Sequence, residues 1–203
     1  MMNTYYIVRH GETVYQTKKE KIIYPWPEVS PLSLTNRGVK EIKTLAKKLK
    51  KAKVDELRSS PRCADACVID LIYSSDIFRA RQTAEIIAKE LGLKVNFDSR
   101  LRDINLGIYH GRKKEEFYRD FPRVFPLRFI KRPPGGESWQ DVQKRMLNFL
   151  KKIDKKQKGK NILIVSHGDP LWLLEGAIKG WNLEKFSKTS KPNYIQPGEL
   201  RKL

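Results

Sequence analysis

Cysteine is scarce in this sequence. Among 203 residues only Cys63 and Cys67 are cysteines, and three residues separate them. No second pair completes a four-ligand zinc site, and no even array of cysteines suggests a secreted disulfide framework. We therefore interpret the two residues as an ordinary reduced pair, and the sequence predicts no metal site.

Long hydrophobic runs are also missing. No apolar stretch approaches the roughly 18 to 20 residues that a membrane-spanning helix needs. The first residues, MMNTYYIVRHGE, lack a basic region followed by a cleavable apolar segment. The sequence therefore predicts a cytoplasmic protein that binds no membrane.

Acidic residues are few as well: 23 Asp and Glu stand against 42 Lys and Arg, which leaves a formal net charge of +19. Such a field attracts polyanions. Many lysines, however, close two segments of helical period, at residues 47–53 and 151–160, where cations complement the helix dipole and face solvent. No basic run is interleaved with aromatic residues, as a base-stacking surface would require. We expect solvated helix faces and, at most, weak and non-specific polyanion binding.

The residues that are present indicate a folded α/β protein. The length favours a single domain over residues 1–203, and 39% hydrophobic residues are too many for a disordered chain. Apolar runs of strand length alternate with segments of helical period, which is typical of strands that feed crossover helices onto a mostly parallel sheet. The expected strands are residues 4–8, 68–73, 93–98 and 161–165.

Capping residues mark where the helices begin. One predicted helix runs to about Leu91, where Gly92 provides a stop. Another carries Val142, Met146 and Phe149 on an inward face. The expected starts are Thr35, Ser74–Asp76, Ser138 with Asp141 in a Ser-x-x-Asp pattern, and Asp169 with Pro170.

Two stretches do not fit this alternation. Residues 52–67 have no sustained period and contain Ser-Ser-Pro, so we expect an irregular insertion there, at about 55–67. Residues 112–137 are rich in Pro, Phe and Arg and end in Pro-Pro-Gly-Gly. That composition favours a segment that covers a site over an element of the sheet.

Two of the three histidines occupy equivalent places. His10 and His167 each follow an apolar strand and precede a glycine, Gly11 or Gly168. Because the carboxyl ends of parallel strands line the ligand crevice of an open sheet, both imidazoles are expected at the same edge. The glycines would let backbone and ligand approach closely. Arg9 precedes His10, and its planar fork can hold two phosphoryl oxygens while an imidazole nitrogen attacks phosphorus.

Further charged residues follow the other strands. Arg79 lies in the first turn of a predicted helix, where backbone donors already favour an anion. Arg81 points about 200° further round that helix, so we expect only Arg79 to reach a phosphate. Asp103 lies in a short segment after a strand and is a candidate acid for a departing oxygen. The alternative is that Asp103 only pairs with a neighbouring cation.

These blocks, taken in order, resemble the histidine phosphatase superfamily, also called phosphoglycerate mutase-like proteins. The resemblance rests on RHGET at residues 9–13, SSDIFRARQTAEII at 74–87, LRDINLG at 101–107, GGES at 135–138 and VSHG at 165–168. Each block alone is a weak signal, but the ordered set spans nearly the whole chain.

The resemblance implies a three-layer α/β/α sandwich with a mostly parallel central sheet and a reaction through a phosphohistidine that needs no metal or other cofactor. His10 would be the nucleophile, and Arg9, Arg79 and His167 would bind and polarise the phosphoryl oxygens. Asp103, where the family most often has glutamate, would act as acid and then as base. The implied substrate-binding residues are Arg9, Gly11, Thr13, Gln16, Arg79, His167 and Gly168.

The sequence departs from the family in the segment that would hold the leaving group. Gln16 stands where the family commonly has asparagine, and residues 17–33 lack its usual Arg-x-Gln-Gly pattern. The favoured activity is hydrolysis of a small phosphorylated metabolite. Mutase-type transfer, hydrolysis of phosphohistidine in proteins, and polyanion binding with vestigial catalysis remain alternatives. Either a monomer or a homodimer fits the sequence.

The basic residues of the two covering stretches suggest a substrate with more than one negative group. They are Lys18, Lys19, Lys21, Arg112, Lys113, Lys114, Arg128, Lys131 and Arg132.

Overall fold

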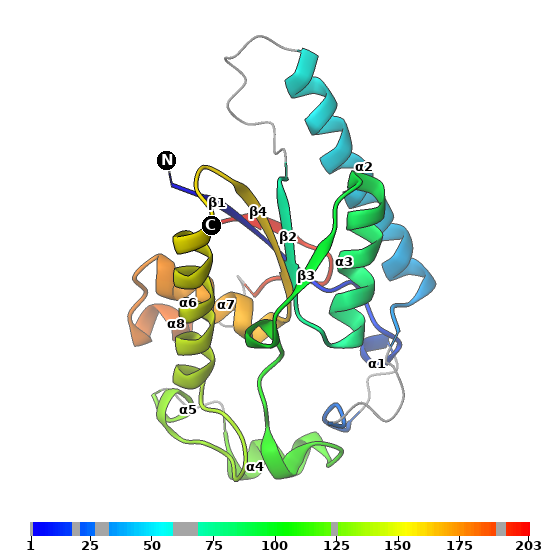
Figure 1. Ribbon diagram of the computed structural model, residues 1–203. Helices are drawn as coiled ribbons and strands as arrows, with labels where there is room; N and C mark the ends of the chain where they lie inside the picture. Colours follow the sequence, from blue (N-terminus) through cyan, green and yellow to red (C-terminus); the bar gives the residue numbers. More distant parts are fainter. Residues whose placement is uncertain (1, 18–20, 27–32, 59–68, 123–125, 190–193) are drawn as a thin grey trace.

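A computed structural model of the chain describes residues 2–17, 21–26, 33–58, 69–122, 126–189 and 194–203. Its centre is a five-stranded sheet in the order β3-β2-β4-β1-β5 (Figure 1). Three neighbouring pairs are parallel, and β5 runs antiparallel to β1 at one edge. The strands are β1 (Thr4–Arg9), β2 (Leu71–Ser74), β3 (Val95–Phe97), β4 (Asn161–Ser166) and β5 (Leu200–Lys202).

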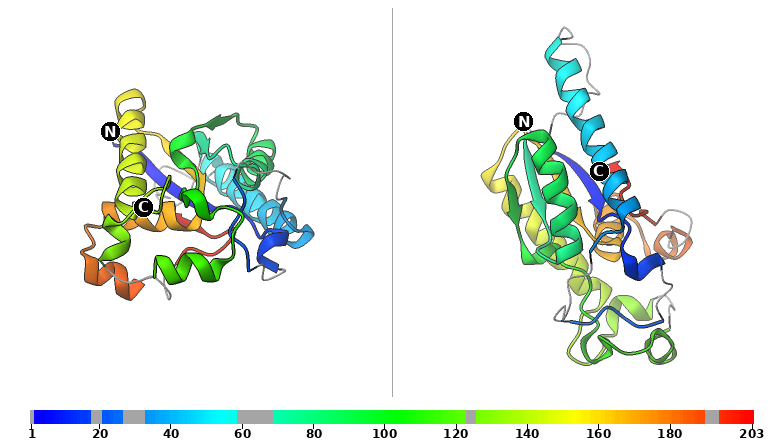
Figure 2. Two further views of the ribbon diagram at one scale, coloured as in Figure 1. Left: turned by 90° about the horizontal axis from the view of Figure 1, so that it is seen from below. Right: turned by 90° about the vertical axis from the view of Figure 1, so that its right-hand side faces the viewer.

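Helices cover both faces of the sheet, so the molecule has three layers (Figure 2). The described helices are α1 (Val14–Thr17), α2 (Asn36–Arg58), α3 (Phe78–Leu91), α4 (Lys114–Asp120), α5 (Leu127–Ile130), α6 (Trp139–Lys156), α7 (Gly168–Ile178) and α8 (Leu183–Thr189). Two short 3-10 turns are η1 (Ser99–Leu101) and η2 (Gly107–Tyr109). This arrangement confirms the fold expected from the sequence.

Alternating residues of β4 explain the two layers of helix. Ile162 and Ile164 pack into one core with α6 and α7, whereas Leu163 and Val165 pack into the other with α2 and α3. Side chains of a strand point alternately to its two faces, and here both faces are apolar because both are covered. Among the described residues no helix is long and apolar enough to cross a membrane.

The expected helix boundaries were right at two starts. Thr35 accepts a hydrogen bond from the backbone N–H of Gly38 at 2.9 Å and caps α2. Ser138 and Asp141 form a capping box at the start of α6, in which the Ser138 side chain accepts from Asp141 N–H and the Asp141 carboxylate accepts from Ser138 N–H. Gly92, with φ of 68°, ends α3 as predicted.

Other boundaries were wrong. The caps of α3 and α7 are Ile77 and His167, because the Asp76 and Asp169 carboxylates bind Arg102 and Tyr194 instead. Helix α2 continues to Arg58, since residues 52–58 hold good helix formers and no Gly or Pro. The insertion expected at residues 55–67 is therefore helical up to that point.

The remaining differences are small. Strand β2 begins later than expected, at Leu71, and β3 is shorter than residues 93–98. Residues 59–68, with both cysteines, lie outside the described part of the chain.

A third, smaller core lies beside the main layers. Ile23 packs against Tyr109, Phe117 and Phe121, which joins the segment 21–26 to the segment 106–121. Backbone hydrogen bonds reinforce this contact, including Ile23 N–H to Arg112 C=O at 2.8 Å. These two segments are far apart in the sequence, and together they form one wall of the site.

Candidate active site

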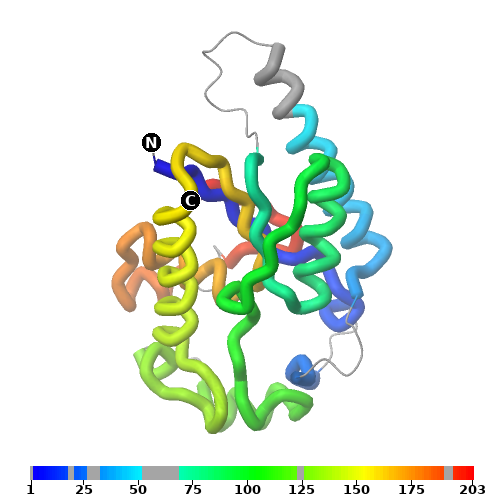
Figure 3. Tube along the Cα trace, in the orientation of Figure 1, coloured from blue at the N-terminus to red at the C-terminus, as the bar shows by residue number. Residues whose placement is uncertain are grey.

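The register of β1 and β4 brings the two histidines together. These strands are parallel neighbours (Figure 3). Arg9 is paired with Ser166, so His10 and His167 directly follow the ends of the two strands. Their ring centroids lie 5.2 Å apart. The shared strand edge that was expected for both imidazoles is therefore present.

Hydrogen bonds orient the His10 ring. Its Nδ1 lies 2.9 Å from the carbonyl oxygen of Gly11, and since a carbonyl can only accept, Nδ1 carries the proton. Nε2 is then unprotonated and accepts from Nε–H of Arg79 at 3.3 Å. Burial, helped by the guanidinium group of Arg79, lowers the pKa of His10 well below its usual range. The ring is thus a neutral imidazole with its lone pair at Nε2.

His167 is completely buried beside it. Its Nε2 lies 2.9 Å from the hydroxyl oxygen of Ser75, which already accepts from the backbone N–H of Ile77. If the hydroxyl donates to Nε2, the proton of the neutral ring is at Nδ1. That nitrogen has no hydrogen-bond partner among the described residues and lies 3.6 Å from Oδ2 of Asp103. Burial and then Arg79 lower the pKa of His167 as well.

Arg79 connects the histidines to the candidate acid. It is buried in the first turn of α3, and its Nη2 donates to Oδ2 of Asp103 at 2.8 Å. Asp103 is less buried, with 29% of its side chain exposed. Arg81 lies elsewhere, over the ring of Phe97 with its guanidinium carbon 4.7 Å from the ring centre.

Arg9 supplies a second guanidinium group. Its Nη1 donates to the carbonyl oxygen of Ile195 at 3.0 Å, and its Nε has no hydrogen-bond partner among the described residues. The ring of Tyr194 lies 5.5 Å from its guanidinium carbon. The C-terminal segment therefore holds Arg9 in place.

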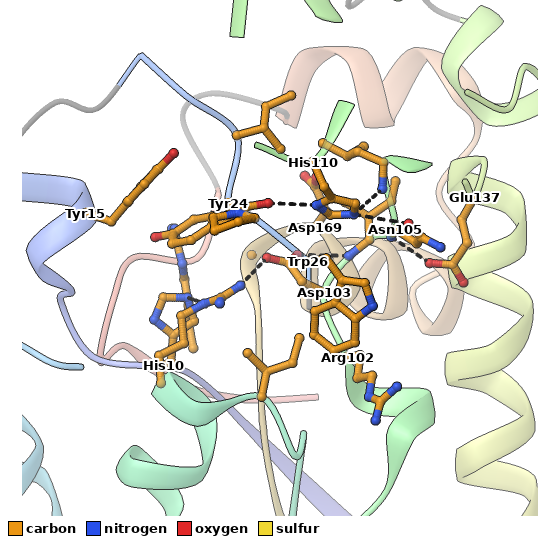
Figure 4. A pocket seen from close by; sticks show the side chains of 18 of the residues that line it. His10, Tyr15, Tyr24, Trp26, Arg102, Asp103, Asn105, His110, Glu137 and Asp169 are labelled. Atoms are coloured by element: carbon orange, nitrogen blue, oxygen red, sulfur yellow. Dashed lines mark hydrogen bonds and ion pairs between the residues drawn. The ribbon is translucent and has the colours of Figure 1, made fainter. Parts of the chain in front are cut away.

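These groups open into a cavity of about 920 Å³ (Figure 4). Arg9, His10, Arg79 and Asp103 line its floor, while His167 is not among the lining residues. Tyr24 lies over Arg79, with 4.2 Å between the guanidinium carbon and the ring centre. Burial raises the pKa of the Tyr24 phenol, so it is a neutral hydrogen-bonding group here.

The other expected substrate-binding residues have different surroundings. Gly11 donates its N–H to Thr83 Oγ1 and packs against Ile42, so its missing side chain makes room for α2. A Cβ on Gly168 would lie 2.4 Å from the hydroxyl of Tyr194, so this glycine makes room for that ring. Both glycines thus make room for protein groups, Gly168 also lines the cavity, and the approach of a ligand to either stays a prediction.

Thr13 and Gln16 hold the cavity wall. Thr13 is buried, and its hydroxyl lies 3.1 Å from the hydroxyl of Tyr24. The Gln16 side-chain oxygen accepts from the backbone N–H of Thr13 at 3.0 Å. Gln16 lines the cavity and Thr13 does not.

Sequence reasoning missed Tyr24, Tyr194 and Ser75. Tyr24 and Tyr194 come from irregular segments without a period, so nothing in the sequence placed them near the histidines. Ser75 did carry a signal, because it directly follows β2, the strand next to β4. The third histidine, His110, joins two wall segments through Nδ1–H to the Tyr24 carbonyl at 2.7 Å.

This arrangement fits an anion with several oxygens. Two guanidinium groups lie around an unprotonated imidazole nitrogen, and Nδ1 of His167 is a third donor when the Ser75 hydroxyl donates to Nε2 of that ring. Among the described residues no group of three or more His, Cys, Asp and Glu side chains is placed to hold a metal ion. Fold and site together define a class, the enzymes that act on phosphate esters.

The comparison with known proteins gives the family. Residues 5–194 match the histidine phosphatase superfamily (branch 1), and the chain belongs to it. It is 28% identical to phosphoserine phosphatase 1 of Hydrogenobacter thermophilus over 187 residues, 89% of this chain and 78% of the relative. It is 33% identical to the probable phosphoglycerate mutase GpmB of Escherichia coli over 181 residues, 86% of this chain and 74% of the relative.

A solved structure shows the same fold. The mycobacterial glucosyl-3-phosphoglycerate phosphatase superposes with a TM-score of 0.74 at 22% identity, over 98% of this chain and 89% of that one.

Proposed function

We propose that this protein hydrolyses a small phosphomonoester through a phosphohistidine at His10, without a metal ion. The observation that carries the proposal is the His10 ring, whose Nδ1 is tied to the Gly11 carbonyl while the unprotonated Nε2 lies at the guanidinium group of Arg79. A nucleophile whose lone pair is oriented toward a phosphate-binding group needs no further activation by a base.

In the first step, Nε2 of His10 attacks phosphorus and the bond to the ester oxygen breaks. Asp103 acts as the general acid and passes a proton to the departing oxygen. Arg9, Arg79 and Nδ1–H of His167 stabilise the charge on the transferred group, which is the main demand of phosphoryl transfer. In the second step, the Asp103 carboxylate takes a proton from water, whose oxygen attacks phosphorus. The P–N bond then breaks, and phosphate and free His10 result.

The test is hydrolysis of an aryl phosphate in excess chelator by the wild type and by His10→Ala. We expect wild-type turnover to survive the chelator and the variant to lose about 10³-fold or more of kcat. A rapid quench of the wild type should trap phosphate on the protein in a form that is stable to alkali and labile to acid. Turnover by His10→Ala at the wild-type rate would overturn the proposal.

A mutase activity is the second candidate, because one relative is a probable phosphoglycerate mutase. A mutase would return the phosphoryl group to a second hydroxyl instead of giving it to water. Conversion of 3-phosphoglycerate to 2-phosphoglycerate, measured beside phosphate release, separates the two. We expect phosphate release to dominate.

A further inference from the structure

The cavity extends well beyond the phosphate-binding residues, and its outer wall contains three further arginines. Each of these is already paired with a carboxylate. Arg100 binds Asp98 at 2.6 Å, Arg102 binds Asp76 at 2.5 Å, and Arg145 binds Glu137 at 2.8 Å. All three pairs use two nitrogens of the guanidinium group and both carboxylate oxygens. Such bidentate pairs leave little charge for a second anionic group of a substrate.

The basic residues that suggested a substrate with several charges mostly lie away from the cavity. Of that set, within the described part of the chain, only Lys114 lines it. Arg132 pairs with Asp141, Arg128 lies over Phe117, and Lys131 lies over Phe121. Of the basic residues that suggested a substrate with several charges, most of those in the described part of the chain therefore contribute no charge to the cavity.

Aromatic side chains also line the cavity, and we call Tyr15, Tyr24 and Trp26 its aromatic wall. Tyr15 and Tyr24 stack on one another with ring centres 4.2 Å apart, and both line the cavity. Trp26 also lines it and is 43% exposed, an unusual position for so large an apolar side chain. The guanidinium carbon of Arg102 lies 5.2 Å from the Trp26 ring centre, and this contact fixes the indole at the mouth of the cavity.

The aromatic wall lies on the side from which a leaving group would depart. Asp103 is the neighbour of Arg102 in the chain, and Figure 4 shows Asp103 between His10 and Trp26. A leaving oxygen that takes its proton from Asp103 would therefore carry its substituent toward Trp26 and Tyr24. A flat ring there would lie against the Trp26 indole and the edge of Tyr24, whose faces contact Tyr15 and Arg79, and it would meet no unpaired arginine.

We propose that this aromatic wall is a subsite for a leaving group with an uncharged, flat ring, so that the preferred substrate is a monoester with a single anionic group and an aromatic substituent. The inference rests on the proposed function, because it takes the phosphoryl group to lie at Arg9 and Arg79. Trp26 and Tyr24 would recognise the ring, and the paired arginines would exclude substrates that need a second cation.

The test compares alkyl phosphates whose alcohols leave equally well, so that chemistry does not decide the result. The ratio of kcat/KM for 2-phenylethyl phosphate to that for butyl phosphate should exceed one by about five- to tenfold in the wild type. Trp26→Ala should bring this ratio close to one, whereas Trp26→Phe should keep most of it. Ile130→Ala, an exposed apolar residue that does not line the cavity, should leave the ratio at the wild-type value.

A second comparison tests the charge. 3-Phosphoglycerate, with its carboxylate, should have a lower kcat/KM than glycerol 3-phosphate. A higher kcat/KM for 3-phosphoglycerate than for glycerol 3-phosphate would overturn the subsite. So would a 2-phenylethyl to butyl phosphate ratio that Trp26→Ala leaves unchanged. The two failures can be told apart by the His10→Ala variant. If only the subsite is wrong, this variant is inactive but the substrate ratios differ from those expected. If the proposed function is wrong, His10→Ala still hydrolyses the substrates.

Discussion

The Arg79 guanidinium group contacts three partners of different kinds. It donates to Nε2 of His10 and to the Asp103 carboxylate, and the Tyr24 ring covers its face. A lysine has one point charge and cannot make planar contacts of this sort. Arg79 is thus the residue on which the relative positions of nucleophile and acid depend.

The two arginines of this helix offer a matched pair of variants. Arg79→Lys should lower kcat/KM for an aryl phosphate by about 10²-fold or more, because a charge remains but the fork is lost. Arg81→Lys should stay within about twofold of the wild type, since Arg81 lies over Phe97. Steady-state kinetics with circular dichroism as a folding check measures both effects. Equal losses in the two variants would contradict the assignment.

From the sequence, helical geometry alone was enough to tell Arg79 from Arg81. The positions of the strand ends alone were enough to place both histidines at one edge of the sheet. Tyr24 and Tyr194 could not be predicted in this way. Tyr24 reaches Arg79 through a long-range contact between residues 21–26 and 106–121. Tyr194 reaches the site from the C-terminal segment and fills the space beside Gly168. Contacts of this kind have no local period, so a single sequence does not reveal them.

Among the secondary-structure elements, α6 supports the acid from behind. Arg145 on this helix donates to the carbonyl oxygens of Arg100 and Asp103 at 2.6 and 3.1 Å. The helix begins at the Ser138 capping box, two residues after Gly136, which packs closely against the backbone of Asn105. The start of α6 and the segment that carries Asp103 are therefore one packed unit.

Loss of this cap should be visible in stability. Ser138→Ala should lower the free energy of unfolding by about 1 to 2 kcal/mol, because the Asp141 N–H loses its acceptor at a buried helix end. Thr44→Ala is the control, since its hydroxyl donates to the Lys40 carbonyl on the exposed face of α2. That change should stay within about 0.5 kcal/mol in urea unfolding. A Ser138→Ala protein with the same free energy of unfolding as the wild type would show that the cap is dispensable.

The sequence identified this cap but misjudged those of α3 and α7, where aspartates looked like good caps. Local preference failed there because Arg102 and Tyr194, distant in the sequence, bind these aspartates. For helix α2 the sequence analysis ended the helix too early. Residues that favour helix continue it to Arg58, beyond the last apolar residue of its inward face. In the interior of the sheet, by contrast, each strand was found because its apolar run is continuous.

For the molecule as a whole, the buried histidines link folding to pH. Both rings are neutral in the folded protein, and Arg9, Arg79 and Arg145 raise the cost of protonating them, with Asp103 as the opposing charge nearby. In the unfolded chain a histidine has a pKa of about 6.5. The unfolded state therefore binds more protons below that pH, and stability falls as the pH is lowered.

We expect the free energy of unfolding to fall by about 3 kcal/mol between pH 7.5 and pH 5.5, the range above that in which the paired carboxylates titrate. The double variant His10→Gln/His167→Gln should lose most of this dependence. Urea titrations at several pH values measure it. A wild-type curve that is flat over this range, or a double variant that keeps the full slope, would show that the two rings do not carry the effect.

The contact between Arg9 and the carbonyl of Ile195 joins residues 186 positions apart, and Gly198 donates its backbone N–H to the carbonyl of Arg9 as well. During synthesis on the ribosome, a nascent chain of 190 residues already contains both histidines, Arg79 and Asp103, but not the segment that holds Arg9. Such a chain could build most of the sheet and still lack a complete site. The site is therefore complete only after the residues that hold the first strand have been synthesised and have left the exit tunnel.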